Sequence, residues 1–149
     1  MSEGIRIYTW GYEGRTVDDL LEVVRKHGVG YVCDVRRQAR GRVPRGFAPE
    51  HLQAALMTVV VDGVPVDYEW LPGLGNAGKT AQWRRRPTAG WDLAVAAANL
   101  AGWTQSGLLL CAEADHRECH RTEVAETLAG VLRACGFEVE VEHLSTTPG

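Results

Sequence analysis

The chain lacks three features that would each place it in a familiar class of proteins. No apolar run approaches the ~20 residues that a membrane-spanning helix needs. None of the four cysteines, Cys33, Cys111, Cys119 and Cys135, belongs to a C-x-x-C pair, which is the spacing typical of zinc ribbons and thioredoxin-type sites. The start, Met-Ser-Glu-Gly-Ile-Arg, carries no signal-peptide pattern. We therefore expect a cytoplasmic protein with free thiols and no membrane partner.

The chain also has little net charge, −3, which argues against a strongly basic nucleic-acid binder. Its basic residues are nevertheless clustered. One cluster comprises Arg36, Arg37, Arg40, Arg42 and Arg45, and a second comprises Lys79, Arg84, Arg85 and Arg86. Such clusters can bind anionic ligands even in a protein of negative net charge, and the alternative is that they are solvated loops.

The length of 149 residues suits one domain, residues 1–149, with a core of its own. Short β-branched runs alternate with helical patterns along the chain. Strands are predicted at residues 5–10, 30–36, 64–71, 107–111 and 138–144. Helices are predicted from Thr16 to Gly28, from Pro49 through Leu56, and over residues 91–105 and 119–135. The alternation predicts an α/β sandwich with a mostly parallel sheet of about five strands.

Ligands of such sheets bind beyond the carboxyl ends of the strands, and polar residues are concentrated there in this sequence. The predicted strand ends carry Thr9, Tyr12, Asp34, Arg36, Cys111, Glu113 and His143. We expect these side chains to gather at one edge of the sheet. For Asp34 in particular, the alternative is a structural salt bridge with an arginine.

Residues 111–121 are the richest segment. The spacing from Cys111 to Arg117 matches the C-x5-R pattern of phosphatases, but the residues between lack glycine and include two carboxylates that would repel a phosphate. Cys119 is a better candidate thiol, because a helix N-terminus can lower a thiol pKa from ~8.5 into the range ~3.5–7.5. The alternative is a small buried residue that packs the helix start. Glu113 is a candidate general base, and Arg121 a candidate anion ligand.

A metal site in this segment would use Cys111, Cys119 and His120, with Glu113 or His143 as a fourth ligand. The C-x7-C-H spacing matches no common zinc signature, and adjacent residues point apart on a helix. We therefore predict no metal ligands, and the sequence leaves any cofactor unknown.

The stretch GLGNAGKT at residues 73–80 matches the phosphate-loop pattern G-x-x-x-x-G-K-[ST]. A phosphate loop needs a buried strand before it and a helix directly after it. Here the preceding run alternates apolar and polar residues and ends at Pro72, and Pro87 follows within seven residues of Thr80. The stretch is better interpreted as a loop whose glycines act as hinges, with Lys79 able to reach an anion.

Three stretches together resemble a known family: YTWGYEGRTVDDLLEVVRKHGVGYVCDVR (8–36), LLLCAEADHRECHR (108–121) and VEVEHL (139–144). They are similar to the bacterial and archaeal family called "domain of unknown function 488". The resemblance implies a single-domain, Rossmann-like three-layer fold and carries no activity with it. It points to Tyr12, Asp34, Arg36, Glu113, Cys119, Arg121 and His143. Trp10 stands where an aliphatic residue is more usual, which leaves the choice of ligand open.

Two classes of function follow, with a third that is weaker. The first is an enzyme, a hydrolase or transferase, that acts on a phosphate-bearing or nucleotide-like substrate. Its catalytic candidates are Glu113, Cys119, His143 and Asp34, and its substrate-binding candidates are Tyr12, Arg36, Arg42, Arg121 and Lys79. The alternative is a module that binds nucleic acid or a protein partner through the arginine-rich loops and exposed aromatics such as Trp83 and Trp91. The third is a phosphate-loop nucleotidase. The oligomeric state stays open.

Overall fold

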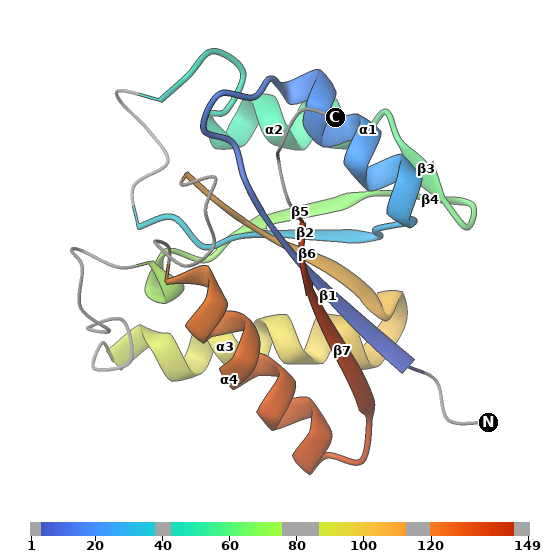
Figure 1. Ribbon diagram of the computed structural model, residues 1–149, viewed down its shortest axis with the longest axis vertical. Coiled ribbons are helices and arrows are strands. Elements are labelled where there is room, and N and C mark those ends of the chain that lie inside the picture. Colours follow the sequence, from blue (N-terminus) through green and yellow to red (C-terminus); the bar gives the residue numbers. More distant parts are fainter. Residues whose placement is uncertain (1–3, 38–42, 76–86, 113–119, 145–149) are drawn as a thin grey trace.

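Five parallel strands form the central sheet of the computed structural model, which describes residues 4–37, 43–75, 87–112 and 120–144. The strands are β1 (Gly4–Gly11), β2 (Tyr31–Asp34), β5 (Asp67–Trp70), β6 (Ser106–Cys111) and β7 (Glu138–His143). Their order across the sheet is β5-β2-β6-β1-β7, and each neighbouring pair is parallel (Figure 1). The predicted parallel sheet is therefore confirmed.

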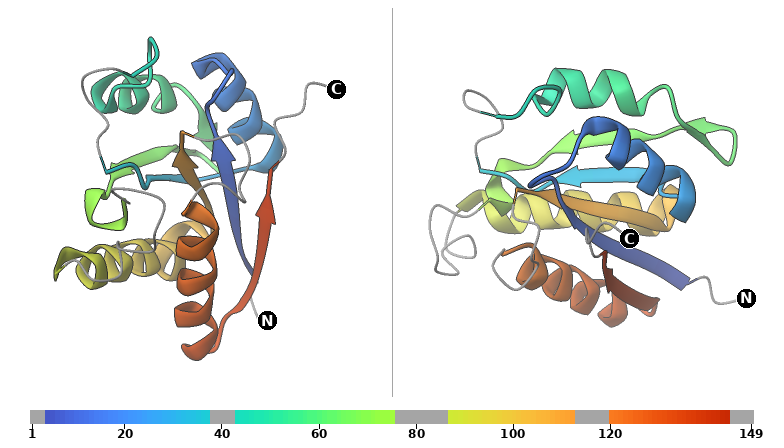
Figure 2. Two further views of the ribbon diagram at one scale, coloured as in Figure 1. Left: turned by 60° about the vertical axis from the view of Figure 1, so that its left-hand side comes forward. Right: turned by 45° about the horizontal axis from the view of Figure 1, so that its top comes forward.

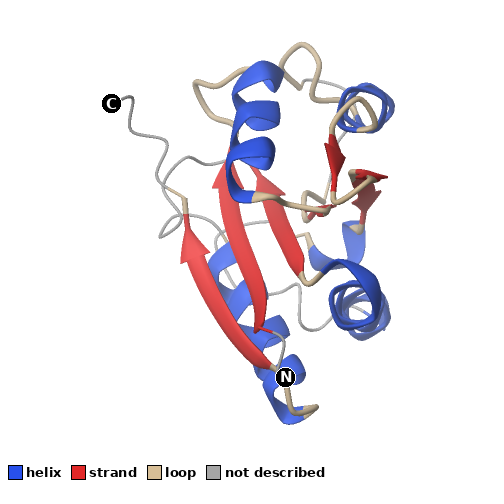
Figure 3. Cartoon of the chain, turned by 90° about the vertical axis from the view of Figure 1, so that its right-hand side faces the viewer, coloured by secondary structure: helices blue, strands red, loops and turns tan. Residues whose placement is uncertain are grey.

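Helices cover both faces of this sheet. Helices α1 (Val17–His27) and α2 (Pro49–Leu56) lie on one face, and α3 (Pro87–Asn99) and α4 (Arg121–Ala134) lie on the other (Figures 2 and 3). Each face buries its own cluster of apolar side chains against its pair of helices. The predicted α/β sandwich is confirmed, and it is consistent with a Rossmann-like fold. Among the described residues, no helix is both long enough and apolar enough to cross a membrane.

Strand β6 shows why the sequence folds into three layers. Leu108 and Leu110 pack into the cluster under α1 and α2, whereas Leu109 and Cys111 pack into the cluster under α3 and α4. Successive side chains of a strand point to opposite faces, so a central strand that is covered on both sides must be apolar throughout. The continuous apolar run in the sequence is the direct consequence.

Helix α1 begins and ends where the sequence predicts. The Thr16 hydroxyl accepts a hydrogen bond from the Asp19 backbone N–H (3.2 Å), and the Asp19 carboxylate accepts one from the Thr16 backbone N–H (2.8 Å). This reciprocal pair is a capping box. Gly28 ends the helix in the left-handed conformation, with φ 64°.

The segment predicted as one strand over residues 64–71 is divided in the structure. Strands β3 (Val60–Val61) and β4 (Val64–Pro65) form a small antiparallel hairpin, and β5 begins only at Asp67. The hairpin turn consists of Asp62 and Gly63, both with positive φ (51° and 79°). Such turns match the twist of paired strands and favour Asp-Gly, so the signal was present in the sequence.

The helix predicted over residues 91–105 begins earlier in the structure, and its last residues form a π-helix instead of an α-helix. Helix α3 starts at Pro87, a residue type whose fixed φ suits the first turn of a helix. After Asn99 the chain continues as a π-helix, Leu100–Thr104, and Gln105 ends it with φ 59°.

Candidate functional site

The carboxyl ends of the parallel strands meet at one edge of the sheet, as the sequence predicts (Figure 1). Strand β1 leads into Tyr12, β2 ends at Asp34 and leads into Arg36, β5 ends at Trp70, and β7 ends at His143. This edge is where ligands bind in open parallel sheets. The described candidates therefore share one side of the molecule.

Asp34 and Arg36 form a buried salt bridge. Asp34 is 0% exposed and Arg36 is 4% exposed. Arg36 Nε lies 2.8 Å from Asp34 Oδ1, and Arg36 Nη2 lies 2.6 Å from Asp34 Oδ2, so the two side chains pair through two parallel hydrogen bonds. The backbone N–H of Arg36 also donates to Oδ1, at 3.1 Å. The salt bridge expected as the alternative for Asp34 is confirmed.

Tyr68, on the neighbouring strand β5, completes the set of donors to Asp34. Its hydroxyl donates to Oδ2 at 2.5 Å, so each carboxylate oxygen accepts two hydrogen bonds. Burial and the negative charge of Asp34 raise the pKa of Tyr68, which keeps its hydroxyl protonated. This arrangement suits a carboxylate that positions other groups, and a catalytic role for Asp34 stays a prediction.

Arg36 is held on several further sides. Its Nη2 donates to the Phe47 carbonyl at 2.7 Å, and its guanidinium carbon lies 5.4 Å from the centre of the Tyr12 ring. The Trp70 indole donates to the Arg36 carbonyl at 2.6 Å. Burial lowers the pKa of Arg36, but the hydrogen bonds and charge of Asp34 outweigh that effect and raise it above its ordinary value. The guanidinium is therefore a fixed, permanent cation.

One nitrogen of the Arg36 guanidinium makes none of these hydrogen bonds. Within the described part of the chain, Nη1 of Arg36 has no hydrogen-bond partner, although it is shielded from solvent. Buried polar atoms in native proteins almost always have a partner, and an exception calls for a specific explanation. A ligand that supplies an acceptor atom to Nη1 would satisfy it.

A second feature of the edge is the way His120 joins three segments of the chain. His120 Nε2 lies 3.0 Å from the Val35 carbonyl and 2.8 Å from the Leu74 carbonyl. Carbonyl oxygens only accept hydrogen bonds, so Nε2 carries the hydrogen in both contacts. The start of α4, the end of β2 and the short 3-10 helix η1 (Pro72–Leu74) consequently lie side by side (Figure 1). We call this contact the His120 clasp.

Gly75 makes the same junction possible from the backbone side. A Cβ atom at Gly75 would lie 2.2 Å from the Arg37 backbone nitrogen, so only glycine permits this approach. A third contact holds the end of β6 nearby, because the Tyr12 and Glu13 backbone N–H groups donate to the Cys111 and Ala112 carbonyls, at 3.1 and 2.8 Å.

These contacts matter because four of the predicted site residues belong to segments that follow or precede them in the sequence. Arg42, Lys79, Glu113 and Cys119 are outside the described residues. Described ranges end at Arg37, at Gly75 and at Ala112, and the range that follows Ala112 begins at His120. The segments that carry the four candidates therefore begin or end beside the His120 clasp.

The remaining candidates are placed as follows. Arg121 is the first residue of α4 and is fully buried. His143 Nδ1 lies 2.7 Å from the Thr9 hydroxyl, and these residues are register partners on β7 and β1. Tyr12 is partly exposed and stacks on Phe47, with ring centres 4.6 Å apart. A binding role for Tyr12 and Arg121, and a catalytic role for His143, remain predictions.

The structure also bears on the phosphate-loop pattern. The strand before it, β5, is an outer strand of the sheet, and η1 follows it directly. The Gly73 backbone N–H donates to the Asp92 carboxylate at 2.8 Å, so a negatively charged side chain already occupies this donor. Both observations disfavour a phosphate bound at Gly73, and residues 76–86 lie outside the described part.

The sequence did not mark Tyr68, Phe47 or Trp70 as site residues, and it indicated His120 only as a possible metal ligand or as a neighbour of Cys119. Their contacts join segments far apart in the chain, and strand patterns carry no information on such pairings.

Among the described residues, no group of three or more His, Cys, Asp or Glu side chains could hold a metal ion.

Comparison with known proteins identifies a family. The family model "Domain of unknown function DUF488" matches residues 16–128, which is well over half of the chain. No curated protein and no solved structure matches the chain. The chain belongs to the DUF488 family.

Proposed function

We propose that this member of the DUF488 family is an enzyme, a hydrolase or transferase, that acts on a phosphate-bearing or nucleotide-like substrate at the carboxyl edge of its sheet. The observation that carries the proposal is the His120 clasp. It joins described residues close to the ends of the segments that contain Arg42, Lys79, Glu113 and Cys119, and it lies next to the buried Arg36. Hydrolysis or transfer of such a substrate needs cations that bind the anion, together with a carboxylate or thiol that reacts.

The residues divide into two roles. The substrate is bound by Arg36, Arg42, Arg121, Lys79 and Tyr12. Of these, the cations of Arg42, Arg121 and Lys79 recognise its phosphate oxygens. Glu113 serves as acid, base or nucleophile, and Cys119 precedes the start of α4, where a helix N-terminus favours the thiolate. His143 is a further proton carrier of the catalytic set, and Asp34 supports Arg36.

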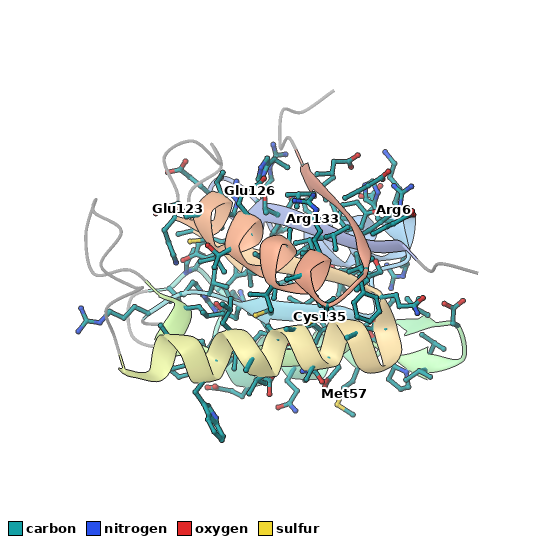
Figure 4. The ribbon with its side chains drawn as sticks, turned by 90° about the horizontal axis from the view of Figure 1, so that it is seen from below. Arg6, Met57, Glu123, Glu126, Arg133 and Cys135 are labelled. Atoms are coloured by element: carbon teal, nitrogen blue, oxygen red, sulfur yellow. The ribbon has the colours of Figure 1, made fainter. Side chains whose placement is uncertain are left out.

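The test is a screen of wild type on nucleotides and sugar phosphates, followed by the variants Glu113→Gln and Cys119→Ser. We expect turnover in wild type and a loss of about 10²–10⁴-fold in Glu113→Gln, the range typical of a lost acid or base. Matched controls are Glu126→Gln and Cys135→Ser, since Glu126 and Cys135 are exposed on and just after α4 (Figure 4). Undetectable turnover in wild type, together with unaltered ligand binding in both site variants, would refute the proposal.

A module that binds nucleic acid is the second candidate, and two observations favour it. Arg37 and Arg45 are exposed at either end of the segment 38–44, and Trp91 is 75% exposed on α3. Exposed basic and aromatic side chains are the groups that bind single strands. On this hypothesis, affinity for a single-stranded oligonucleotide falls steeply between ~50 and ~200 mM salt. Binding that survives neutralisation of Arg37, Arg45 and Arg84 to Arg86 would exclude it.

A phosphate-loop nucleotidase is the weakest candidate. It requires Mg-ATP to bind at residues 73–80, which isothermal titration calorimetry measures directly. The Asp92 carboxylate on Gly73 N–H makes us expect no Mg-ATP binding that depends on Lys79.

We also propose that the protein works in the cytoplasm. The thiols of Cys33 and Cys135 are free of disulfide bonds, which suits a reducing compartment. Fractionation of the producing cells tests this, and recovery in a membrane or secreted fraction would contradict it.

A further inference from the structure

The unused nitrogen of Arg36 defines what kind of group it can receive. The guanidinium gives Nε and Nη2 to Asp34 and Phe47, which leaves the two N–H groups of Nη1 for another acceptor. Arg36 is 96% buried, so this acceptor would be bound in a largely desolvated position. Its chemistry must therefore suit a buried environment.

Charge compensation argues against an anion at this nitrogen. The buried Arg36 cation is already neutralised by the buried Asp34 carboxylate at 2.6 Å. A phosphate brought to Nη1 would add a negative charge for which the pair has no excess positive charge, and burying an unbalanced charge is costly. An uncharged acceptor, such as a carbonyl oxygen or a ring nitrogen, would satisfy Nη1 without that cost.

The surroundings of Arg36 favour a flat ligand. Tyr12 stacks on Phe47 with ring centres 4.6 Å apart, and Phe47 stacks on Trp10 at 6.5 Å. Phe47 and Trp10 are buried, whereas Tyr12 is partly exposed, so Tyr12 is the ring that a ligand would meet first. Aromatic side chains of this kind bind nucleobases by stacking, whatever their sequence.

We propose that Arg36 binds the uncharged acceptor edge of a planar heterocycle, of the nucleobase class, with the ring against Tyr12. The proposal rests on the proposed function, because a nucleotide-like substrate carries both a base and a phosphate. The phosphate is then held by cations that have no such compensation. Arg37 is one, since it is exposed and takes part in no salt bridge within the described ranges.

Isothermal titration calorimetry with adenosine, guanosine, cytidine and uridine tests the assignment, because these nucleosides have no phosphate. We expect at least one of them to bind wild type with an affinity that stays constant from about 50 to about 500 mM NaCl, since no ligand charge is screened. We expect Arg36→Lys to weaken that affinity about tenfold or more, because lysine retains the charge opposite Asp34 but loses the planar fork of donors. Excess inorganic phosphate should not displace the nucleoside.

Two further variants keep the test decisive. Tyr12→Leu removes the partly exposed ring and leaves the Asp34–Arg36 pair in place, so it should also weaken nucleoside binding. Arg6→Lys makes the same exchange at an exposed arginine on β1 that pairs with Glu140, and it should bind like wild type.

Failure of all four nucleosides to bind, or displacement by phosphate that depends on Arg36, would overturn the assignment. Nucleotide turnover without nucleoside binding would reject this inference alone, whereas nucleoside binding without turnover of any nucleotide would reject the proposed enzyme alone.

Discussion

At the scale of residues, the contacts of Asp34 can be divided into those that local sequence predicts and those that it does not. Asp34 and Arg36 are two positions apart in an extended segment, so their side chains leave on the same side, and a salt bridge of Asp34 with an arginine was the alternative that the sequence offered. Two further contacts come from distant parts of the chain. Tyr68, whose hydroxyl contacts Asp34, is 34 positions from it in the sequence, and Phe47, whose carbonyl contacts Arg36, is 11 positions from Arg36. Those contacts depend on which strand neighbours β2 and on how residues 43–48 return to the sheet.

Replacing Asp34 with Asn should be strongly destabilising. The change leaves the buried Arg36 cation without its counter-charge, and breaking a buried pair from one side costs about 3–5 kcal/mol. Tyr68→Phe removes a single donor to the same carboxylate and should cost about 1–3 kcal/mol. Urea denaturation measures both. The matched control is Glu140→Gln, which breaks the exposed bridge to Arg6 and should leave stability unchanged. Equal losses in Asp34→Asn and Glu140→Gln would contradict this account.

Three buried acidic protons make stability sensitive to alkaline pH. Burial raises the pKa of the Cys33 thiol above its ordinary value of 9.0, and it raises those of Tyr31 and Tyr68 above 10.0. The unfolded chain loses these protons at a lower pH than the folded chain. Stability from these groups is therefore complete below about pH 9 and falls as the pH rises beyond it. Urea denaturation between about pH 8 and pH 11 measures the slope, and Tyr31→Phe should reduce it. An unchanged slope in Tyr31→Phe would count against burial as the cause.

At the scale of elements, hydrophobic patterns and capping residues predicted most of the fold. Thr16 and Gly28 bound α1 as expected, and the apolar run of β6 lies at the centre of the sheet. The β3–β4 hairpin was missed although Asp62-Gly63 is a strong turn signal, because residues 64–71 were treated as one run. The His120 clasp was out of reach, since it joins residues 85 and 46 positions apart.

The junction of elements at the clasp can be tested through its glycine. Gly75→Ala would place a Cβ atom 2.2 Å from the Arg37 nitrogen, so the end of β2 and the exit of η1 must separate. We expect a loss of about 1–3 kcal/mol in thermal or urea unfolding, together with weaker ligand binding at the edge. Gly130→Ala is the control, because Gly130 lies within α4 with open space around it, and alanine should stabilise that helix by up to about 1 kcal/mol. A neutral Gly75→Ala would show that the junction tolerates separation.

At the scale of the whole molecule, the outer strand β7 needs protection from pairing with other chains. Its residues alternate between Glu138, Glu140 and Glu142 on one face and two valines that pack on the other. Arg133, at the end of α4, donates to the Val139 carbonyl at 2.8 Å (Figure 4). A hollow of about 360 Å³ lies along this edge, lined by residues of β1 and β7 together with Arg133. Charged side chains and occupied carbonyl groups are common means of preventing edge-to-edge association.

Removing that charge should promote self-association. The double change Glu140→Val with Glu142→Val gives β7 an uninterrupted apolar and β-branched surface, which favours strand pairing. Light scattering coupled to size exclusion should show a higher mass than wild type at equal concentration. Glu126→Val, on the exposed side of α4, should keep the wild-type mass. Identical masses for the double variant and wild type would mean that these glutamates do not guard the edge.

The hairpin of β3 and β4 offers a practical handle on the molecule. Its turn, Asp62-Gly63, precedes the amino end of β5, so it lies away from the edge where the strands end (Figure 1). Exposed turns of this kind accept inserted residues with little effect on the fold. A peptide tag or a dye placed there would anchor the protein to a sensor surface with the carboxyl edge of its sheet facing the solution.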